Sequence, residues 1–152
     1  MSPVGLDCVP WIDRWKFLFT DERCVSLDHP DSNYRACAEF IFSKANIPAH
    51  NILCINNMAD PHMSAEDYAR RMESFLGGNA IDLAILGMGP DGHTCSLFPN
   101  HPLLDAPTDV MVASIVDSPK PPPSRITLTL SALSYCREVL FYPNIFLGRF
   151  LI

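Results

Sequence analysis

The residues whose types and spacing could perform chemistry gather in one glycine-rich segment. Asp91 and His93 stand two residues apart, and Gly87, Gly89 and Gly92 surround them. An imidazole has an ordinary pKa of about 6.5, so a histidine can take up and return a proton near neutral pH. Glycines let the backbone approach a ligand closely. The segment therefore predicts a ligand site with an acid–base group, although an isolated histidine here could also simply cap the loop.

The apolar run at residues 81–86 directly precedes this segment. Such a nearly continuous run is typical of a strand that is covered on both faces in a parallel sheet. The glycine segment would then lie at the carboxyl edge of the sheet, where open α/β folds bind their ligands.

The spacing of the three glycines also satisfies the bare dinucleotide-binding pattern. That pattern requires the glycines to open into a long helix whose free N–H groups meet a pyrophosphate. Pro99 and Pro102 leave little room for such a helix, and Asp91 would place a carboxylate among the amides that face the phosphates. A nicotinamide or flavin cofactor is therefore disfavoured.

Strands and helices are expected to alternate along the chain. Apolar runs predict strands over 15–20, 51–55, 81–86, 110–116, 125–130 and 139–142. One helix is expected over 33–44, capped by Asp31 or Ser32, and a second after the capping-box pattern at 64–67, with an apolar stripe from Tyr68 to Leu76. Alternation of this kind predicts an α/β fold, Rossmann-like, with a mostly parallel sheet and flanking helices.

The composition is that of a single globular domain. The chain has 152 residues, of which 48% are hydrophobic and 18% charged, and no apolar run reaches the length of about 20 residues that crosses a bilayer. With a formal charge of −6 and no face-forming run of Lys and Arg, neither nucleic acid nor a membrane is an expected partner. The six cysteines are scattered without a C-x-x-C pair, and no secretion signal is visible, so we expect free thiols and a cytoplasmic location.

The segment from Leu86 to Pro99, with the sequence L-G-M-G-P-D-G-H-T-C-S-L-F-P, closely resembles the motif of the 6-phosphogluconolactonase family. Further segments resemble that family in the same order: D-E-R at 21–23, D-S-N-Y at 31–34, S-P-K-P-P at 118–122 and R-I-T-L-T at 125–129. The resemblance spans residues 15–141. The related glucosamine-6-phosphate deaminases share a G-x-G-x-D-G-H loop but continue into an F-N-E-P type of sequence, which this chain lacks.

The resemblance implies hydrolysis of 6-phosphogluconolactone to 6-phosphogluconate in the oxidative pentose phosphate pathway, with no cofactor and no covalent intermediate. His93 would be the base that activates water, supported by Asp91 or, alternatively, by Asp21. The substrate phosphate would be bound by three cations, which are Arg23, Lys120 and Arg125. The backbone at Gly87, Gly89 and Gly92 would form the substrate loop.

Other site chemistries are weaker expectations. Thr94, Cys95 or Ser96 could be a nucleophile, but the G-x-S-x-G elbow is absent. Asp21, His29 and His93 match no common spacing of metal ligands, so no metal is expected. The prolines at 119–123 could be a ligand for an SH3-like domain, but predicted strands flank them closely.

The resemblance leaves both ends unmatched. Residues 1–14 lack the earlier strand and glycine-rich phosphate loop with which the family begins, and the apolar tail at 142–152 has no family counterpart. We therefore expect a partial 6-phosphogluconolactonase-like domain at 15–141 that keeps the base but binds substrate poorly. A catalytically impaired form that binds sugar phosphate or a protein partner is the alternative, and the sequence predicts no oligomeric state.

Overall fold

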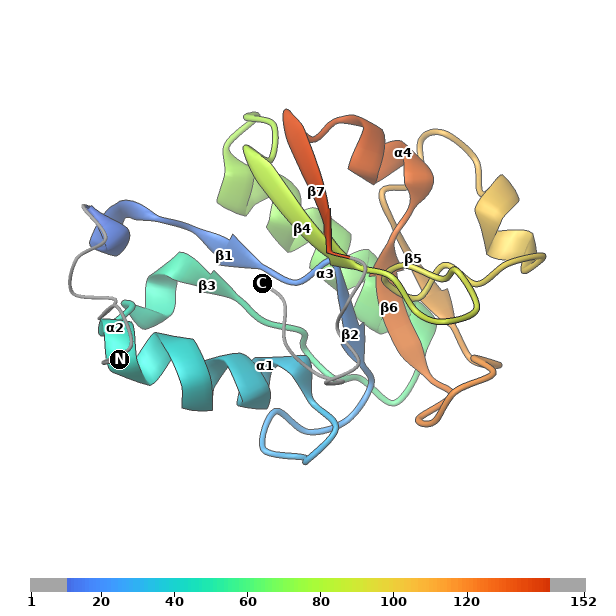
Figure 1. Ribbon diagram of the computed structural model, residues 1–152, viewed down its shortest axis with the longest axis horizontal. Coiled ribbons are helices and arrows are strands. Elements are labelled where there is room, and N and C mark those ends of the chain that lie inside the picture. Colours follow the sequence, from blue (N-terminus) through green and yellow to red (C-terminus); the bar gives the residue numbers. More distant parts are fainter. Residues whose placement is uncertain (1–10, 143–152) are drawn as a thin grey trace.

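The computed structural model describes residues 11–142, and within them strands and helices alternate (Figure 1). The strands are β1 (Phe17–Leu18), β2 (Asp21–Arg23), β3 (Ile52–Leu53), β4 (Leu83–Gly87), β5 (Val112–Ile115), β6 (Arg125–Leu128) and β7 (Glu138–Tyr142). The helices are α1 (Asn33–Cys37), α2 (Ser43–Ala45), α3 (Pro61–Leu76) and α4 (Leu130–Ser134), with a π-helical segment at Ala38–Phe42 and 3-10 turns at Ile12–Arg14, Ala49–Asn51 and Pro102–Asp105. The expectations for residues 1–10 and 143–152 lie outside the described residues.

The α/β class is confirmed, and two of the strand pairs are parallel. β1 pairs with β3, and β4 pairs with β7. The three-stranded sheet β2-β6-β5 is antiparallel, which the pattern of strands did not predict. Only the short proline-rich loop joins β5 to β6, whereas a parallel connection needs a crossover of about a dozen residues or more.

The first helical region runs from Asn33 to Ala45 through α1, the π-helical segment and α2. Ser32 caps it as predicted, because its side chain accepts a hydrogen bond from the backbone N–H of Arg35. Asn46 ends it in the left-handed conformation with φ 52°. Its buried residue Phe42 packs with Phe17 and Phe19, so that this helical region and β1 share one apolar cluster.

Helix α3 begins earlier than the predicted capping box. Asp60 is the N-cap and accepts from the N–H of His62, while Pro61 occupies the first helical position. The expectation of a start at Ser64 was therefore wrong: Ser64 lies inside the first turn, where its hydroxyl accepts from the N–H of Met58. The predicted stripe is confirmed by the buried Tyr68 and Met72, and Gly77 caps the carboxyl end with φ 62°.

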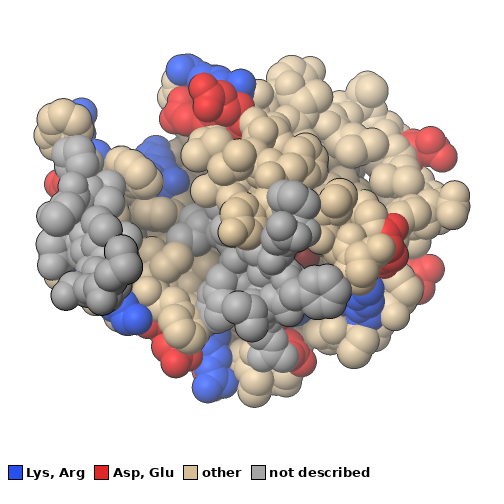
Figure 2. All heavy atoms as spheres, viewed as in Figure 1, with Lys and Arg blue, Asp and Glu red and all other residues tan. Residues whose placement is uncertain are grey.

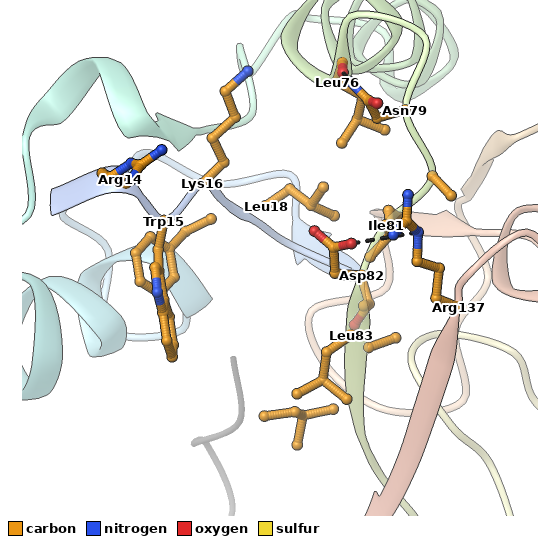
Figure 3. A pocket seen from close by; sticks show the side chains of 15 residues that line it. Arg14, Trp15, Lys16, Leu18, Leu76, Asn79, Ile81, Asp82, Leu83 and Arg137 are labelled. Carbon is orange, nitrogen blue, oxygen red and sulfur yellow. Dashed lines mark hydrogen bonds and ion pairs between the residues drawn. The ribbon is translucent and has the colours of Figure 1, made fainter. Parts of the chain in front are cut away.

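Strand β4 is buried on one face instead of both. Ala84 and Leu86 lie in the larger apolar cluster, whereas Leu83 is 49% exposed. Its neighbour on one side is β7. On its other side a groove of about 690 Å³ separates β4 from β1, and its lining includes Trp15, Lys16 and Leu83 (Figure 3).

No helix in the described part of the chain is both long enough and apolar enough to cross a membrane. On the face shown in Figure 2, charged side chains form small separate groups near the outline, with Lys and Arg often beside Asp and Glu.

Candidate active site

The loop that follows β4 folds back on itself through its glycines. The N–H of Gly89 donates to the carbonyl of His93 at 2.8 Å, and the N–H of Gly92 donates to the carbonyl of Gly89 at 2.9 Å. Gly92 adopts φ +84°, a conformation that side chains disfavour. The hydroxyl of Thr94 donates to the carbonyl of Gly87 at 2.8 Å, which closes the loop against the end of the strand.

Within this loop Asp91 and His93 form a direct pair. The carboxylate Oδ1 of Asp91 lies 2.5 Å from Nδ1 of His93. The hydrogen bond from His93, together with a second one from Lys120, holds the pKa of the Asp91 carboxyl well below its usual range. An ionised carboxylate can only accept, so the proton of the neutral imidazole belongs on Nδ1. This leaves Nε2 as the basic nitrogen.

Lys120 joins this pair from the proline-rich loop. Its Nζ lies 3.0 Å from Oδ1 of Asp91 and 3.1 Å from Nδ1 of His93. Since both nitrogens carry protons, the carboxylate between them is the group that attracts each. The three side chains therefore form one cluster, although Lys120 and His93 lie 27 positions apart in the sequence.

The imidazole of His93 is enclosed by two uncharged neighbours. A Cβ added at Gly89 would overlap Nδ1 and Cε1 of the ring, so the glycine permits the close approach. The ring of Phe98 stacks on the imidazole with 4.7 Å between centroids and 27° between planes. Phe98 is 3% exposed and was not among the predicted site residues.

Asp21 lies in a second network and is not the partner of the imidazole. Its Oδ2 accepts from the hydroxyl of Ser96 at 2.9 Å, and its Oδ1 from the side-chain amide of Asn33 at 3.4 Å. Ser96 is fully buried and also lies 3.4 Å from a guanidinium nitrogen of Arg125. Of the two predicted carboxylates, the structure thus brings Asp91 to His93, while Asp21 anchors the residues behind it.

Arg125 is buried, and most of its donors are already used. Nε donates to the carbonyl of Pro122 at 2.9 Å, and Nη2 to those of Lys120 at 2.7 Å and Pro121 at 3.2 Å. With the contact to Ser96, four of the roughly five guanidinium N–H groups have protein partners. Burial lowers the pKa of Arg125, with the neighbouring Arg23 adding to the effect. Arg125 therefore fixes the proline-rich loop.

The hydrogen bonds of the proline-rich loop also test whether residues 119–123 could be a docking ligand for an SH3-like domain. The backbone carbonyls of residues 120–122 accept from Arg125, and the hydroxyl of Ser118 donates to the carbonyl of Lys120. A docking ligand needs a free extended segment. The polyproline interpretation thus gains no support from the structure.

Arg23 stands opposite Arg125 in the antiparallel pair of β2 and β6. One of its Nη atoms donates to the carbonyl of Asp31 at 2.8 Å. Its Nε is buried and has no hydrogen-bond partner among the described residues. Of the three predicted phosphate ligands, Arg23 and Arg125 therefore lie side by side, and Lys120 contacts Arg125 through its backbone while its ammonium turns toward Asp91.

Glu22 is a buried carboxylate that sequence reasoning passed over. It is fully buried and accepts from the backbone N–H groups of Arg23, Asn33 and Tyr34, at 2.7, 2.8 and 2.7 Å. Burial raises the pKa of Glu22, and these hydrogen bonds offset the rise only in part. The carboxylate ties the start of α1 to β2, and so fixes both neighbours of Glu22 that were predicted for the site.

None of the candidate nucleophiles has a free, activated side chain. The thiol of Cys95 has a pKa raised to about 12 by burial, and the hydroxyls of Thr94 and Ser96 already donate to Gly87 and Asp21. Cys24, Cys37, Cys54, Cys95 and Cys136 are free, while Cys8 lies outside the described residues. Among residues 11–142 no three His, Cys, Asp or Glu side chains converge as metal ligands.

Comparison with known proteins gives the family. Residues 6–144 match the family described as glucosamine-6-phosphate isomerases/6-phosphogluconolactonase. The 6-phosphogluconolactonase of Homo sapiens is 47% identical over 131 residues, which is 84% of this chain and 50% of that protein. A probable chloroplastic 6-phosphogluconolactonase of Oryza sativa subsp. indica is 38% identical over 144 residues, or 88% of this chain and 44% of its own length. The chain spans about half the length of the curated relatives it matches.

Solved structures agree. The 6-phosphogluconolactonase of Thermotoga maritima superimposes with a TM-score of 0.77 at 38% identity, covering 91% of this chain and 63% of that one. The 6-phosphogluconolactonase of Trypanosoma cruzi gives 0.75 at 26% identity, covering 84% and 55%. On the family match and these relatives together, the chain belongs to the glucosamine-6-phosphate isomerase/6-phosphogluconolactonase family.

Proposed function

We propose that this chain carries the catalytic residues for hydrolysis of 6-phosphogluconolactone to 6-phosphogluconate. The observation that carries the proposal is the pair formed by Asp91 and His93 at the end of β4, with 2.5 Å between carboxylate and imidazole. The names of the relatives supply the substrate, and the pair supplies a reaction that suits an ester.

In the proposed reaction, Nε2 of His93 takes a proton from water while the water oxygen bonds to the lactone carbonyl carbon. Collapse of the tetrahedral intermediate breaks the bond to the ring oxygen, and the imidazolium returns the proton to that oxygen. Asp91 keeps the proton on Nδ1 and stabilises the charge that the ring carries in between, as a carboxylate does in hydrolytic triads. No covalent intermediate is required, which agrees with the bonded state of Thr94 and Ser96.

The phosphate of the substrate needs positive charge at a distance from this base. We propose that Arg23, Lys120 and Arg125 supply it, with Arg23 the best placed to bind because its Nε lacks a protein partner in the described structure. Arg125 can offer at most about one further N–H, so its main contribution is to order the loop that carries Lys120. The ammonium of Lys120 lies beside Asp91 and His93, while the backbone carbonyl of the same residue accepts from Arg125. The backbone at Gly87, Gly89 and Gly92 is proposed to approach the substrate closely, and Asp21 to hold Ser96 beside Arg125.

The deciding experiment measures lactone hydrolysis above the spontaneous background for the chain and for His93→Ala. His50→Ala is the matched control, because His50 is exposed in the 3-10 turn at Ala49–Asn51, away from the glycine loop. Loss of a general base should lower kcat by about 100-fold or more, whereas His50→Ala should leave it unchanged. Equal rates for the chain and His93→Ala would refute the proposed role. Release of ammonia from glucosamine 6-phosphate, assayed in parallel, would instead favour the deaminase side of the family.

The second candidate is a form that binds sugar phosphate without efficient turnover. Calorimetric binding of 6-phosphogluconate without hydrolysis would support this alternative.

The burial of free thiols such as Cys37 fits a reducing compartment, and we propose the cytoplasm as the location.

A further inference from the structure

We propose that Phe98 is a positioning residue, whose ring fixes the plane of the His93 imidazole and relates it to the guanidinium of Arg125. The catalytic meaning of this proposal rests on the proposed lactone hydrolysis. The positioning itself can be measured in the absence of any reaction.

The ring of Phe98 lies against the imidazole of His93. The two rings stack with 4.7 Å between centroids and 27° between planes. This is the geometry of an offset aromatic pair in which one flat ring limits the tilt of the other. Because Phe98 is 3% exposed and follows the buried Leu97, its ring is held by the protein interior and can serve as a fixed surface.

Two charged groups face one edge of the imidazole. Asp91 and Lys120 both act at the Nδ1 edge, and their side chains are 39% and 38% exposed. A hydrogen bond at one nitrogen defines the position of that atom but still allows the ring to swing about it. The ring of Phe98 restricts this swinging motion, because it lies against the face of the imidazole.

The ring of Phe98 also contacts the guanidinium of Arg125. The guanidinium carbon of Arg125 lies 5.8 Å from the centroid of the same Phe98 ring, within the range of a cation–π contact. Arg125 is itself immobilised by the carbonyls of Lys120, Pro121 and Pro122. Phe98 therefore holds the proposed base at a set distance from a proposed phosphate-binding residue, as a substrate with a fixed spacing between carbonyl and phosphate requires.

The test compares Phe98→Leu and Phe98→Tyr with Phe42→Leu, a control in the other apolar cluster with a similarly buried ring. Proton NMR follows the Nδ1 proton of His93, assigned by its loss in Asp91→Asn, and steady-state kinetics give kcat and KM. Phe98→Leu should lose the slowly exchanging proton signal and about 100-fold in kcat, with KM nearly unchanged, as expected when a reacting group is misplaced. Phe98→Tyr, which keeps the flat ring, should retain the signal and most of kcat, and Phe42→Leu should retain both in full.

Retention of the Nδ1 proton signal in Phe98→Leu, or its equal loss in Phe42→Leu, would overturn the proposal. If the unmodified chain hydrolyses no lactone, the proposed function fails while the NMR comparison of Phe98→Leu with Phe42→Leu still decides the positioning role. If Phe98→Tyr does not fold, the same comparison decides it alone.

Discussion

Gly89 lies so close to the imidazole of His93 that a Cβ on residue 89 would overlap two atoms of the ring. The backbone of Gly89 does not adopt a positive φ, in contrast to that of Gly92 at +84°. The absence of a side chain at residue 89 is therefore required for space, and it sets where the proposed base can stand.

Gly89→Ala should accordingly displace the imidazole. We expect kcat for the lactone to fall by about 100-fold, because a base displaced by about 1 Å no longer reaches its proton. Gly77→Ala is the control: its left-handed φ of 62° should cost about 1 to 2 kcal/mol of unfolding free energy without changing kcat. A fully active Gly89→Ala variant would show that the imidazole is not held against residue 89 in solution.

The two carboxyl oxygens of Glu22 are surrounded by backbone N–H donors. In Glu22→Gln the amide nitrogen would face backbone N–H donors, since the two carboxylate oxygens together accept from Arg23, Asn33 and Tyr34. We expect a loss of about 1 to 3 kcal/mol of unfolding free energy in urea titrations near neutral pH. Glu39→Gln, at an exposed position of the same helical region, should change it by less than about 0.5 kcal/mol.

The raised pKa of Glu22 predicts that the free energy of unfolding depends on pH. Burial raises the pKa of the folded-state carboxyl above that of the unfolded chain, so between the two values the folded state holds more protons. Stability contributed by this group therefore falls as the pH rises from about 4.3, the ordinary pKa of a glutamate, through the raised value. The advantage of the unmodified chain over Glu22→Gln should shrink across that window. An advantage that grows with pH would contradict the direction of the shift.

The hydroxyl of Tyr68 connects α3 to Phe19, the residue that follows β1. It accepts from the N–H of Phe19 at 2.8 Å and donates to the carbonyl of the same residue at 3.1 Å, in a fully buried position. Tyr68→Phe removes both of these hydrogen bonds and should cost about 1 to 3 kcal/mol of unfolding free energy. Tyr135→Phe, at a residue that is 64% exposed, should cost less than about 0.5 kcal/mol. Equal effects of the two substitutions would show that the hydroxyl of Tyr68 contributes no net stability.

Local signals in the sequence predicted the elements better than their pairing. Ser32 was correctly identified as a cap because capping depends on residues within one turn. The start of α3 was misplaced although Asp60 and Pro61 carried a stronger signal than Ser64. The pairing of β2 with β6 depends on contacts between residues about a hundred positions apart, such as Asp21 with Thr127, which no local pattern records.

The residues of the site show the same difference between local and long-range contacts. The pairing of Asp91 with His93 could be predicted because they lie two positions apart on one loop. The approach of Lys120 to both could not, because it depends on how the proline-rich loop is held by Arg125. Phe98 is part of the family motif, but a phenylalanine beside apolar residues is normally predicted to belong to the hydrophobic core. Its contact with the imidazole of His93 is seen only in the structure.

The position of Lys120 leads to a prediction about which end of the substrate it serves. Because its Nζ lies 3.0 Å from Asp91, Lys120→Met should alter the environment of the base itself. We therefore expect hydrolysis of unphosphorylated gluconolactone to fall, and hydrolysis of 6-phosphogluconolactone to fall further, because the ammonium is also proposed to bind the phosphate. Arg23→Met should have a different effect from Lys120→Met. The guanidinium of Arg23 has a buried Nε without a partner among the described residues, and no contact among these residues joins it to His93.

The phosphorylated substrate should accordingly lose about 10-fold or more in kcat/KM with Arg23→Met, the effect of removing about 1.4 kcal/mol of phosphate binding, while the unphosphorylated lactone is unaffected. The ratio of the two substrates' kcat/KM values is the measurement, because it cancels any general loss of folded protein. A Lys120→Met variant that loses activity only toward the phosphorylated lactone would place the ammonium at the phosphate when substrate is bound. The contact between Lys120 and Asp91 would then exist only in the absence of substrate. On binding, the ammonium would leave Asp91 and contact the phosphate of the substrate.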